Sequence, residues 1–257
     1  MRVQLTVLGS GTSSGVPIIS CRCRVCSSAD PRDKRTRPSI LLRYNGSVVV
    51  IDTGPDFRCQ ALRENITRLD AVLLTHAHAD HILGLDDTRP LSYPDGKIIH
   101  IYGNLPALEG LRRIFSYAFD KNVFYASMPL VQDHLITGPL ELFGLRFIPI
   151  PTWHGKLEVL GFRIGNFAYL TDYNEVPESS LELLRGIDVI FLDALRYTEH
   201  PTHMTVTQAV ELAKSIQPKK AYLTHISHEL GHAETNAYLP LGIELCYDGM
   251  NLELEIE

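Results

Sequence analysis

The sequence predicts an α/β fold, a layered sandwich in which helices cover the outer faces of the sheets. Short apolar runs with strand character alternate along the chain with segments of helical periodicity. Several apolar runs end in clusters of polar residues, so we expect the functional residues to lie at the ends of the strands. No Gly/Ser-rich linker or internal repeat divides the 257 residues, so we expect a single domain.

The composition excludes several classes of protein. The 24 Lys and Arg against 30 Asp and Glu give a formal net charge of −6, which argues against a broad non-specific nucleic-acid binder. No apolar stretch approaches the ~20 residues of a membrane span, so we expect no membrane association. Residues 1–9 alternate as a strand does and lack the apolar core of a signal peptide. We therefore expect a cytoplasmic protein with reduced cysteines.

The first half of the chain is predicted to contain a strand, a glycine-rich tight turn, a loop, a hairpin closed by Asn45-Gly46, a short helix and a buried strand. The glycine-rich turn lacks the helix and later acidic residue of a dinucleotide-binding turn. In order, these elements are residues 3–8, 9–15, 16–38, Ser39–Tyr44 with Val48–Ile51, Leu62–Leu69 and Ala71–Leu74.

The second half is predicted to alternate strands with helices. Helices are expected over Glu178–Arg185 and Val206–Ile216, the second because its apolar residues share one face. The predicted strands are Lys97–Tyr102, Leu145–Ile150, Val159–Ile164, Phe167–Leu170, Val189–Leu192 and Ala221–Leu223, before a closing stretch over Ile243–Glu257.

The densest functional signal directly follows the strand predicted over Ala71–Leu74. His76, His78, Asp80 and His81 stand there within six positions. In an extended chain His76 and His78 share a face, and a following helical turn brings Asp80 and His81 beside them. Imidazole and carboxylate groups bind Zn²⁺ and also suit Mn²⁺ or Fe²⁺. The cluster therefore favours a metal site over a solvated polar loop.

Three further metal-binding side chains, His154, Asp172 and His225, follow other apolar runs. Such side chains at the ends of four separate runs predict one shared site. Three ligands per ion and a shared carboxylate would leave room for a bridging water between two ions about 3.5–4 Å apart.

The pattern His76-x-His78-x-Asp80-His81 with the three downstream residues resembles the metallo-β-lactamase superfamily of binuclear hydrolases. The resemblance implies an αββα sandwich over residues 1–257. It also implies that Asp52, in the turn Asp52-Thr53-Gly54, holds ligand histidines in place. The implied ligands are His76, His78 and His154 on one ion, Asp80, His81 and His225 on the other, and Asp172 as the bridge.

Three cysteines form a second candidate metal site. The spacing of Cys21, Cys23 and Cys26 is typical of three of the four ligands of a structural Zn²⁺. His228 is the expected fourth ligand and would pin a zinc-binding loop, at about 16–38, beside the first site; His232 is the weaker candidate. A redox role for the thiols is the alternative. The remaining cysteines, Cys59 and Cys246, are expected to be buried or semi-buried.

The turn at residues 9–17 followed by these cysteines is similar to the phosphoribosyl cyclic phosphodiesterase (PhnP) branch of the superfamily. That branch carries a structural zinc ion on three Cys and one His, which implies Cys21, Cys23, Cys26 and His228 here. It lies near the tRNA 3′-processing endonucleases, and it suggests a homodimer.

Cleavage of a phosphodiester benefits from a general acid, because the departing alkoxide has a high pKa. Histidine suits this task near neutral pH. By the resemblance, His203 falls where the branch places a catalytic histidine, and we expect Asp193 to orient it. Asp80 and Asp172 complete the expected catalytic residues. The other histidines near no motif are expected to be structural or exposed: His200, His100 and His134.

We therefore expect a dinuclear metal-dependent phosphodiesterase that hydrolyses a small cyclic phosphodiester, such as phosphoribosyl 1,2-cyclic phosphate, through a metal-bridging hydroxide. Its expected cofactors are two catalytic Zn²⁺ or Mn²⁺ ions and one structural Zn²⁺.

Alternatives are a tRNA 3′-processing nuclease, a non-catalytic or redox-sensing metal protein, and, as minor candidates, thioester or lactam hydrolysis. The stretch Arg89–Phe147 has no long basic insertion of the kind that would hold a tRNA. The basic residues of the 16–38 loop are expected to form a solvated face or a phosphate-steering rim, not an RNA platform. They are Arg22, Arg24, Arg32, Lys34, Arg35 and Arg37.

Overall fold

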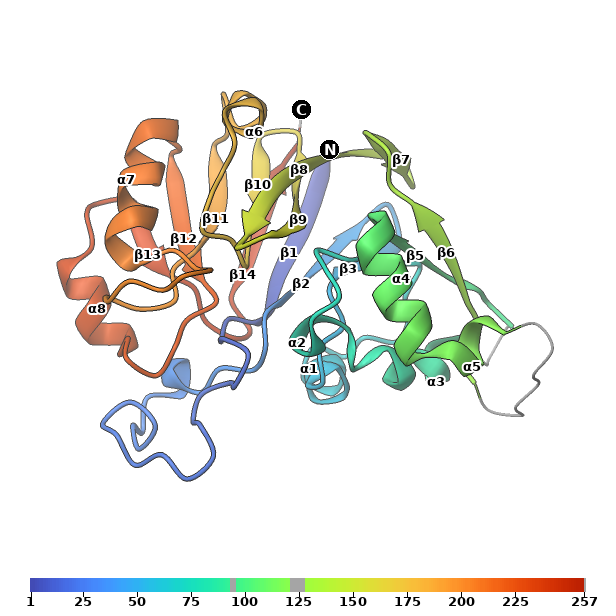
Figure 1. Cartoon of the computed structure of the whole chain (residues 1–257), viewed down its shortest axis with the longest axis horizontal. Coiled ribbons are helices and arrows are strands. Elements are labelled where there is room, and N and C mark those ends of the chain that lie inside the picture. Colours follow the sequence, from blue (N-terminus) through green and yellow to red (C-terminus); the bar gives the residue numbers. More distant parts are fainter. Residues whose placement is uncertain (93–95, 121–127, 257) are drawn as a thin grey trace.

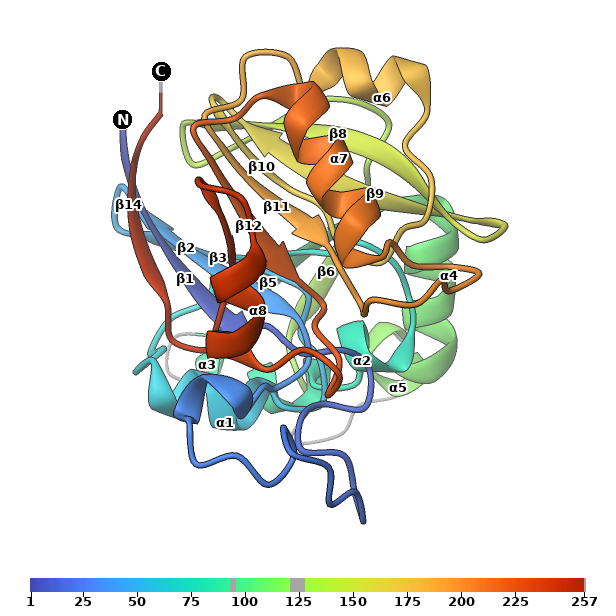
Figure 2. The same ribbon diagram turned by 90° about the vertical axis from the view of Figure 1, so that its left-hand side faces the viewer.

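Two β-sheets face each other at the centre of the molecule, and helices lie on their outer faces (Figure 1). The computed structural model describes residues 1–92, 96–120 and 128–256. Within these ranges each sheet has seven strands, in the orders β14-β1-β2-β3-β4-β5-β6 and β13-β12-β11-β10-β9-β8-β7. The predicted sandwich of two sheets between helices is thus confirmed. Figure 2 shows α7 and α8 over the sheet that contains β11 and β12.

The first sheet and its helices come mostly from the N-terminal half. The strands are β1 (Arg2–Gly9), β2 (Ser39–Tyr44), β3 (Ser47–Ile51), β4 (Ala71–Leu73), β5 (Ile99–Gly103), β6 (Val131–Leu135) and β14 (Asn251–Glu255). The helices are α1 (Phe57–Arg63), α2 (Ala79–Ile82), α3 (Arg89–Ser92), α4 (Leu105–Ile114) and α5 (Ser116–Phe119), with short 3-10 turns at Pro31–Asp33 and Leu85–Thr88.

The second sheet comes from the C-terminal half. Its strands are β7 (Leu140–Leu142), β8 (Leu145–His154), β9 (Leu157–Ile164), β10 (Phe167–Tyr169), β11 (Val189–Asp193), β12 (Lys220–Thr224) and β13 (Ile243–Leu245). Its helices are α6 (Glu178–Leu183), α7 (Val206–Ile216) and α8 (His232–Tyr238). Across the described ranges, none of the helices is both long and apolar enough to traverse a bilayer.

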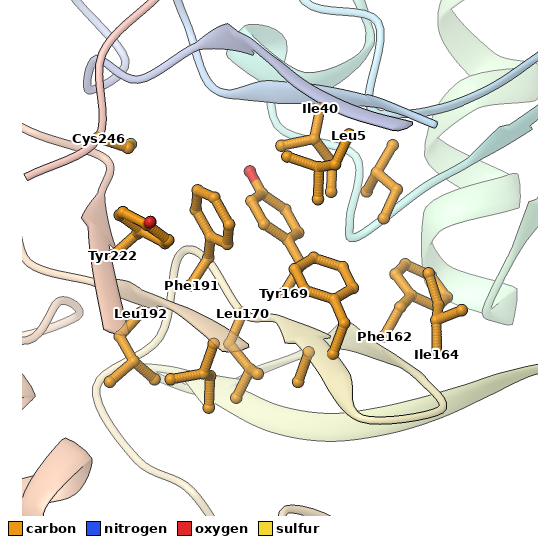
Figure 3. Packing of buried hydrophobic residues seen from close by; sticks show 14 of the residues in the cluster. Leu5, Ile40, Phe162, Ile164, Tyr169, Leu170, Phe191, Leu192, Tyr222 and Cys246 are labelled. Atoms are coloured by element: carbon orange, nitrogen blue, oxygen red, sulfur yellow. The ribbon is translucent and has the colours of Figure 1, made fainter. Parts of the chain in front are cut away.

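The main hydrophobic core lies between the two sheets. Tyr169 and Phe191 of the second sheet reach toward Leu5 and Ile40 of the first (Figure 3). All four side chains are fully buried. Burial of each such side chain contributes about 1.5–3 kcal/mol relative to exposure, so this interface fixes how the two sheets sit against each other.

The strand directions bring the ends of both sheets together. Strands β3, β4, β5 and β6 run parallel in the first sheet, as do β10, β11, β12 and β13 in the second. The carboxyl ends of parallel strands meet at one edge, where ligands bind in open α/β sheets. The polar residues that follow these strands therefore gather at one end of the sandwich.

The structure corrects the helix predicted over Leu62–Leu69. The helix is α1, Phe57–Arg63, and Asn65 follows it with a positive φ of 50°. Phe57 and Gln60 supply its buried face, whereas Leu62 is 67% exposed. The predicted strand Leu145–Ile150 extends to His154, because its pairing with β9 continues through two prolines. The prediction also missed α4, although Asn104 caps it by accepting a hydrogen bond from the Ala107 N–H.

Arg35 anchors the N-terminal loop to the C-terminal half of the chain. Its side chain is completely buried and forms an ion pair with Asp33 at 3.0 Å. It also donates hydrogen bonds to the carbonyls of Ser227, at 3.0 Å, and Leu230, at 2.7 Å. The Asp33 carboxylate accepts a further bond from the His232 N–H. The loop is therefore held by a buried polar network.

We expect Arg35→Met to lower the free energy of unfolding by about 3–5 kcal/mol, because it leaves the Asp33 carboxylate buried without its partner. Urea denaturation measures this difference. The control is Arg32→Met, which removes an exposed partner of Asp30 and should change the midpoint little. Equal effects of the two substitutions would contradict the anchoring role.

Candidate metal centre

The predicted ligands lie together at the edge where the two sheets meet. His76 and His78 follow β4, and Asp80 and His81 lie on α2. The second sheet supplies the other three from the ends of separate strands. They are His154 at the end of β8, Asp172 after β10 and His225 after β12.

Three residues at this edge have left-handed backbone. Asp52, Asp172 and His225 have φ values of 63°, 54° and 58°. Such values are uncommon for residues other than glycine, although Asp and His are among those that adopt them. Asp52 and His225 directly follow β3 and β12, and Asp172 lies three residues past the end of β10. Strained backbone of this kind concentrates at functional sites.

Three imidazoles form the first part of the centre. The ring of His76 lies 4.5 Å from that of His78 and 5.7 Å from that of His154, and the last two rings are 5.2 Å apart. His76 is buried and His154 is partly buried, whereas His78 faces solvent. These three imidazoles, which the resemblance implies as ligands of the first ion, lie next to one another.

Two carboxylates and two imidazoles form the second part. Candidate ligand atoms of Asp80, His81, Asp172 and His225 all lie within 4.8 Å of one another. His225 Nε2 lies 2.9 Å from Asp172 Oδ1 and 3.7 Å from Asp80 Oδ2, and His81 Nε2 contacts both carboxylates. Asp172 Oδ2 is also 3.9 Å from His76 Nε2. Asp172 therefore lies between the two parts, where a bridging carboxylate belongs.

The outer nitrogens of the histidines are fixed by hydrogen bonds. Asp52 accepts from His81 Nδ1 at 2.7 Å and from the Thr75 hydroxyl at 2.8 Å. Because the Thr75 hydroxyl donates to Asp52, it accepts from His76 Nδ1, at 3.0 Å. His154 Nδ1 donates to the Thr202 carbonyl at 2.8 Å. Each ring therefore presents Nε2 to the centre, as metal-binding histidines do. The predicted contact of Asp52 with a ligand histidine is present.

The electrostatics of the centre favour cations. Burial alone raises the pKa of Asp172 and of Asp80, but His225 and His81 outweigh it, and both pKa values fall below the ordinary range. Burial alone lowers the pKa of His225, but Asp172 and other carboxylates raise it to about 10. The carboxylates are thus ionised at neutral pH, and His225 gives up a proton when a cation takes its place.

The donor atoms fit divalent metal ions. The Nε2 atoms of His76, His81 and His225 and Oδ2 of Asp172 are buried and form no hydrogen bond. Orphaned buried polar atoms are costly unless an ion or another group satisfies them. Nitrogen and carboxylate donors in this arrangement match the ligands of Zn²⁺ and of related transition metals.

His203 and Asp193 lie beside Asp172. His203 Nδ1 is 3.4 Å from Asp193 Oδ1 and 3.4 Å from Asp172 Oδ1, and its ring stacks on that of His225 at 4.7 Å. Asp193 Oδ2 accepts a hydrogen bond from the Met204 N–H at 2.9 Å, which fixes the carboxylate. Asp193 Oδ1 is also 3.6 Å from His225 Nδ1. One carboxylate therefore faces both the candidate acid and a candidate ligand.

His200, which was predicted to be structural or exposed, lies beside His203. The ring lies 5.0 Å from that of His203 and is only partly exposed. Its Nδ1 accepts a hydrogen bond from the Thr202 N–H at 3.3 Å, so Nε2 carries the proton. The carbonyl of Thr202 holds His154 at the same time. In the sequence, His200 stands only three positions before His203.

The three cysteines converge on His228. The Sγ atoms of Cys21, Cys23 and Cys26 lie 3.3, 3.4 and 3.7 Å from His228 Nδ1. Tetrahedral zinc with Zn–S of about 2.3 Å and Zn–N of about 2.0–2.1 Å places sulfur and nitrogen ligands roughly 3.5 Å apart. The alternative ligand, His232, instead accepts a hydrogen bond from the Asn236 side chain at 3.0 Å.

The charge state of the thiols suits a metal ion. The Cys26 N–H, followed by side-chain contacts, lowers the pKa of Cys23 to about 6. The thiolate is the form of cysteine that binds zinc. Burial raises the pKa of Cys26 to about 11, so this thiol loses its proton only when a cation is bound.

The chain is similar to a known protein family and to several solved structures. The β-lactamase superfamily domain matches residues 48–226 of the chain. A crystal structure of a new diphosphatase from the PhnP family is 51% identical, with a TM-score of 0.94, and the alignment covers 100% of this chain and 98% of that one. The Zn²⁺-bound PqqB of Methylobacterium extorquens, at 20% identity, TM-score 0.79 and coverage of 98% and 100%, shares the fold.

One curated relative is much longer than this chain. The octanoyltransferase of Porphyromonas gingivalis is 40% identical over 249 residues, which make up 95% of this chain and 50% of that protein. The chain thus spans about half the length of that relative. The name octanoyltransferase describes the longer protein.

We expect about three metal ions per chain, two in the histidine–aspartate centre and one on the cysteines. Cys23→Ser should reduce the count to about two, because it removes one of four ligands. Cys59→Ser is the matched control, since Cys59 is exposed and lies outside the cluster. Elemental analysis of the purified proteins gives the count. A wild-type count of one would refute the two-site arrangement.

Proposed function

Because the chain belongs to the β-lactamase superfamily, we propose that it is a metal-dependent phosphodiesterase that hydrolyses a small cyclic phosphodiester, of which phosphoribosyl 1,2-cyclic phosphate is the type. The observation that carries the proposal is His203, a 7% exposed imidazole facing both Asp193 and the candidate bridging residue Asp172. An acid in that position serves a leaving group that departs as an alkoxide.

The candidate ligands form two sets, one for each of two metal ions. His76, His78 and His154 would hold one divalent ion, and Asp80, His81 and His225 the other, with Asp172 shared. Two such ions, when bound, lower the pKa of a water molecule and neutralise the phosphoryl oxygens. Asp52 and the Thr202 carbonyl keep the ligand rings in the orientation that binding requires.

The chain's own residues supply the proton for the leaving group. As an imidazolium, His203 donates its Nδ1–H to Asp193 and can give its Nε2 proton to the departing oxygen, which leaves the ring neutral. The Met204 N–H holds Asp193 in place. His200 presents a neutral Nε2–H beside this position, and such a donor suits a phosphoryl or sugar oxygen.

Four of the six basic side chains of the loop are paired with carboxylates, which supports a small substrate over RNA. Arg24, Arg32, Arg35 and Arg37 each face a carboxylate, respectively of Glu234, Asp30, Asp33 and Asp56. An RNA platform needs unpaired cations that neutralise phosphates. The net charge of −6 points the same way. RNA is therefore the less favoured substrate, and a tRNA 3′-processing nuclease the less favoured function.

A second candidate reaction is hydrolysis of a diphosphate bond. The 51% identity to a PhnP-family diphosphatase over the whole chain favours it. The two reactions use the same attacking chemistry but differ in the leaving group. A phosphate leaves readily without protonation, whereas a ribose alkoxide needs an acid. The contribution of His203 therefore distinguishes them.

We expect Asp172→Ala to lower turnover of bis-p-nitrophenyl phosphate by at least about 100-fold, because losing even an outer-shell partner of a metal site costs about 10–100-fold. The matched control is Asp188→Ala, which removes a partly exposed carboxylate paired with Lys219 and should leave turnover unchanged. Turnover that survives Asp172→Ala would contradict the bridging role of Asp172, whereas a wild-type protein with no turnover would favour a non-catalytic or redox-sensing metal protein.

We expect His203→Ala to slow hydrolysis of ribose 1,2-cyclic phosphate by about 10²–10⁴-fold and that of bis-p-nitrophenyl phosphate much less, since p-nitrophenolate needs no proton. Initial rates on both substrates give the comparison. Equal losses on the two would remove the acid role. The wild-type protein is also assayed on a diphosphate, a pre-tRNA 3′ trailer and an acyl thioester. If it turns over any of these faster than the cyclic ester, that compound class replaces the cyclic ester as the proposed substrate.

A further inference from the structure

Two histidines that stand apart in the sequence are neighbours in the fold. His100 lies on β5 and His134 on the adjacent parallel strand β6. Both were predicted from the sequence to be structural or exposed. Neither belongs to the clusters of three or more candidate ligands found in the described part of the chain.

The strand register places both rings on one face. Ile99 and Ile101 point into the core beneath the helices, so His100 and Tyr102 point to the other face. His134 is paired with Tyr102 in the register and therefore shares that face. The ring of Tyr102 stacks on that of His134 at 4.7 Å with a tilt of 19°, which holds it in position.

The two imidazole nitrogens are close enough to bind one ion. His100 Nδ1 lies 2.9 Å from His134 Nε2, with the rings 5.1 Å apart and tilted by 43°. Two nitrogens at about 2.0–2.1 Å from an ion are roughly 2.8–3.0 Å apart at a 90° angle and roughly 3.3–3.4 Å apart in a tetrahedron. The observed distance matches the 90° angle of tetragonal or square-planar coordination, which Ni²⁺ and Cu²⁺ prefer.

We propose that His100 and His134 form a peripheral binding site for a divalent transition-metal ion of the Ni²⁺ or Cu²⁺ type, separate from the hydrolytic centre. The two imidazoles supply adjacent positions of the coordination sphere. Water or a small ligand fills the others. Both side chains are partly exposed, so an ion reaches them from solvent.

The surroundings keep the rings available as ligands. Burial, followed by His134 and Lys97, lowers the pKa of His100, so the ring is neutral at pH 7, as binding requires. The nearby carboxylate of Asp70 is engaged by Arg68, Lys97 and the Val48 N–H. Because Asp70 is engaged in this way, it offers the site no free carboxylate, and the site disfavours Mg²⁺ and Ca²⁺, which prefer oxygen ligands.

The test is a Cu²⁺ titration of the full chain already loaded with zinc, followed by ring ¹H–¹⁵N NMR and equilibrium dialysis. We expect one additional Cu²⁺ per chain and paramagnetic broadening that is strongest at the imidazole signals of His100 and His134. His100→Gln and His134→Gln should each weaken this binding by about tenfold or more. Gln132→Ala, a neighbour on the same face, is the matched control and should bind as the wild type does.

Unbroadened signals of His100 and His134 in the wild type would overturn the proposal and leave the pair as a hydrogen bond. Broadening confined to the rings of the hydrolytic centre would overturn it equally. The wild-type spectrum shows whether the ion binds at His100 and His134, and this result does not depend on the stability of the variants. Neither result depends on turnover of the phosphodiester, so the proposal for this site is tested independently of the proposed function.

Discussion

Four buried carboxylates at the seam between the sheets impose the main constraint on this protein. The side chains of Asp52, Asp80, Asp172 and Asp193 are 0%, 9%, 3% and 0% exposed. An ionised carboxylate removed from water must be compensated by hydrogen bonds or by positive charge. Asp52 is compensated by Thr75 and His81. Asp172 faces mainly imidazoles, and cations bound there would complete the charge balance of the centre.

Neither sheet contains the whole centre, so its geometry depends on how the sheets pack. The first sheet supplies the His76–His81 segment, and the second supplies His154, Asp172 and His225. A single segment, 225–228, then joins this centre to the cysteine site. Ile226 is paired with the glycine-rich turn through Ser10, and Arg35 holds the Ser227 carbonyl. The N-terminal loop therefore buttresses the hydrolytic centre.

Most strands could be predicted from the sequence, because their apolar runs are local and bounded by turns. Val206–Ile216 was predicted to the residue, since its Thr205 cap and apolar face agree. The helix at Leu62–Leu69 was wrong because an exposed leucine resembles a buried one in a sequence pattern. Strands β6 and β7 were missed because they are short and largely exposed, and their position comes from pairing with distant segments.

The candidate ligands were identifiable from the sequence by residue type and spacing, since four of them lie within six positions and the others follow apolar runs. Only the tertiary structure decided which atoms meet. The left-handed backbone at Asp172 and His225, the Asp193 carboxylate facing two histidines, and the contact of His100 with His134 all arise from chain segments far apart in the sequence. Side-chain chemistry is encoded locally, whereas proximity between strands depends on register and packing, which no local pattern records.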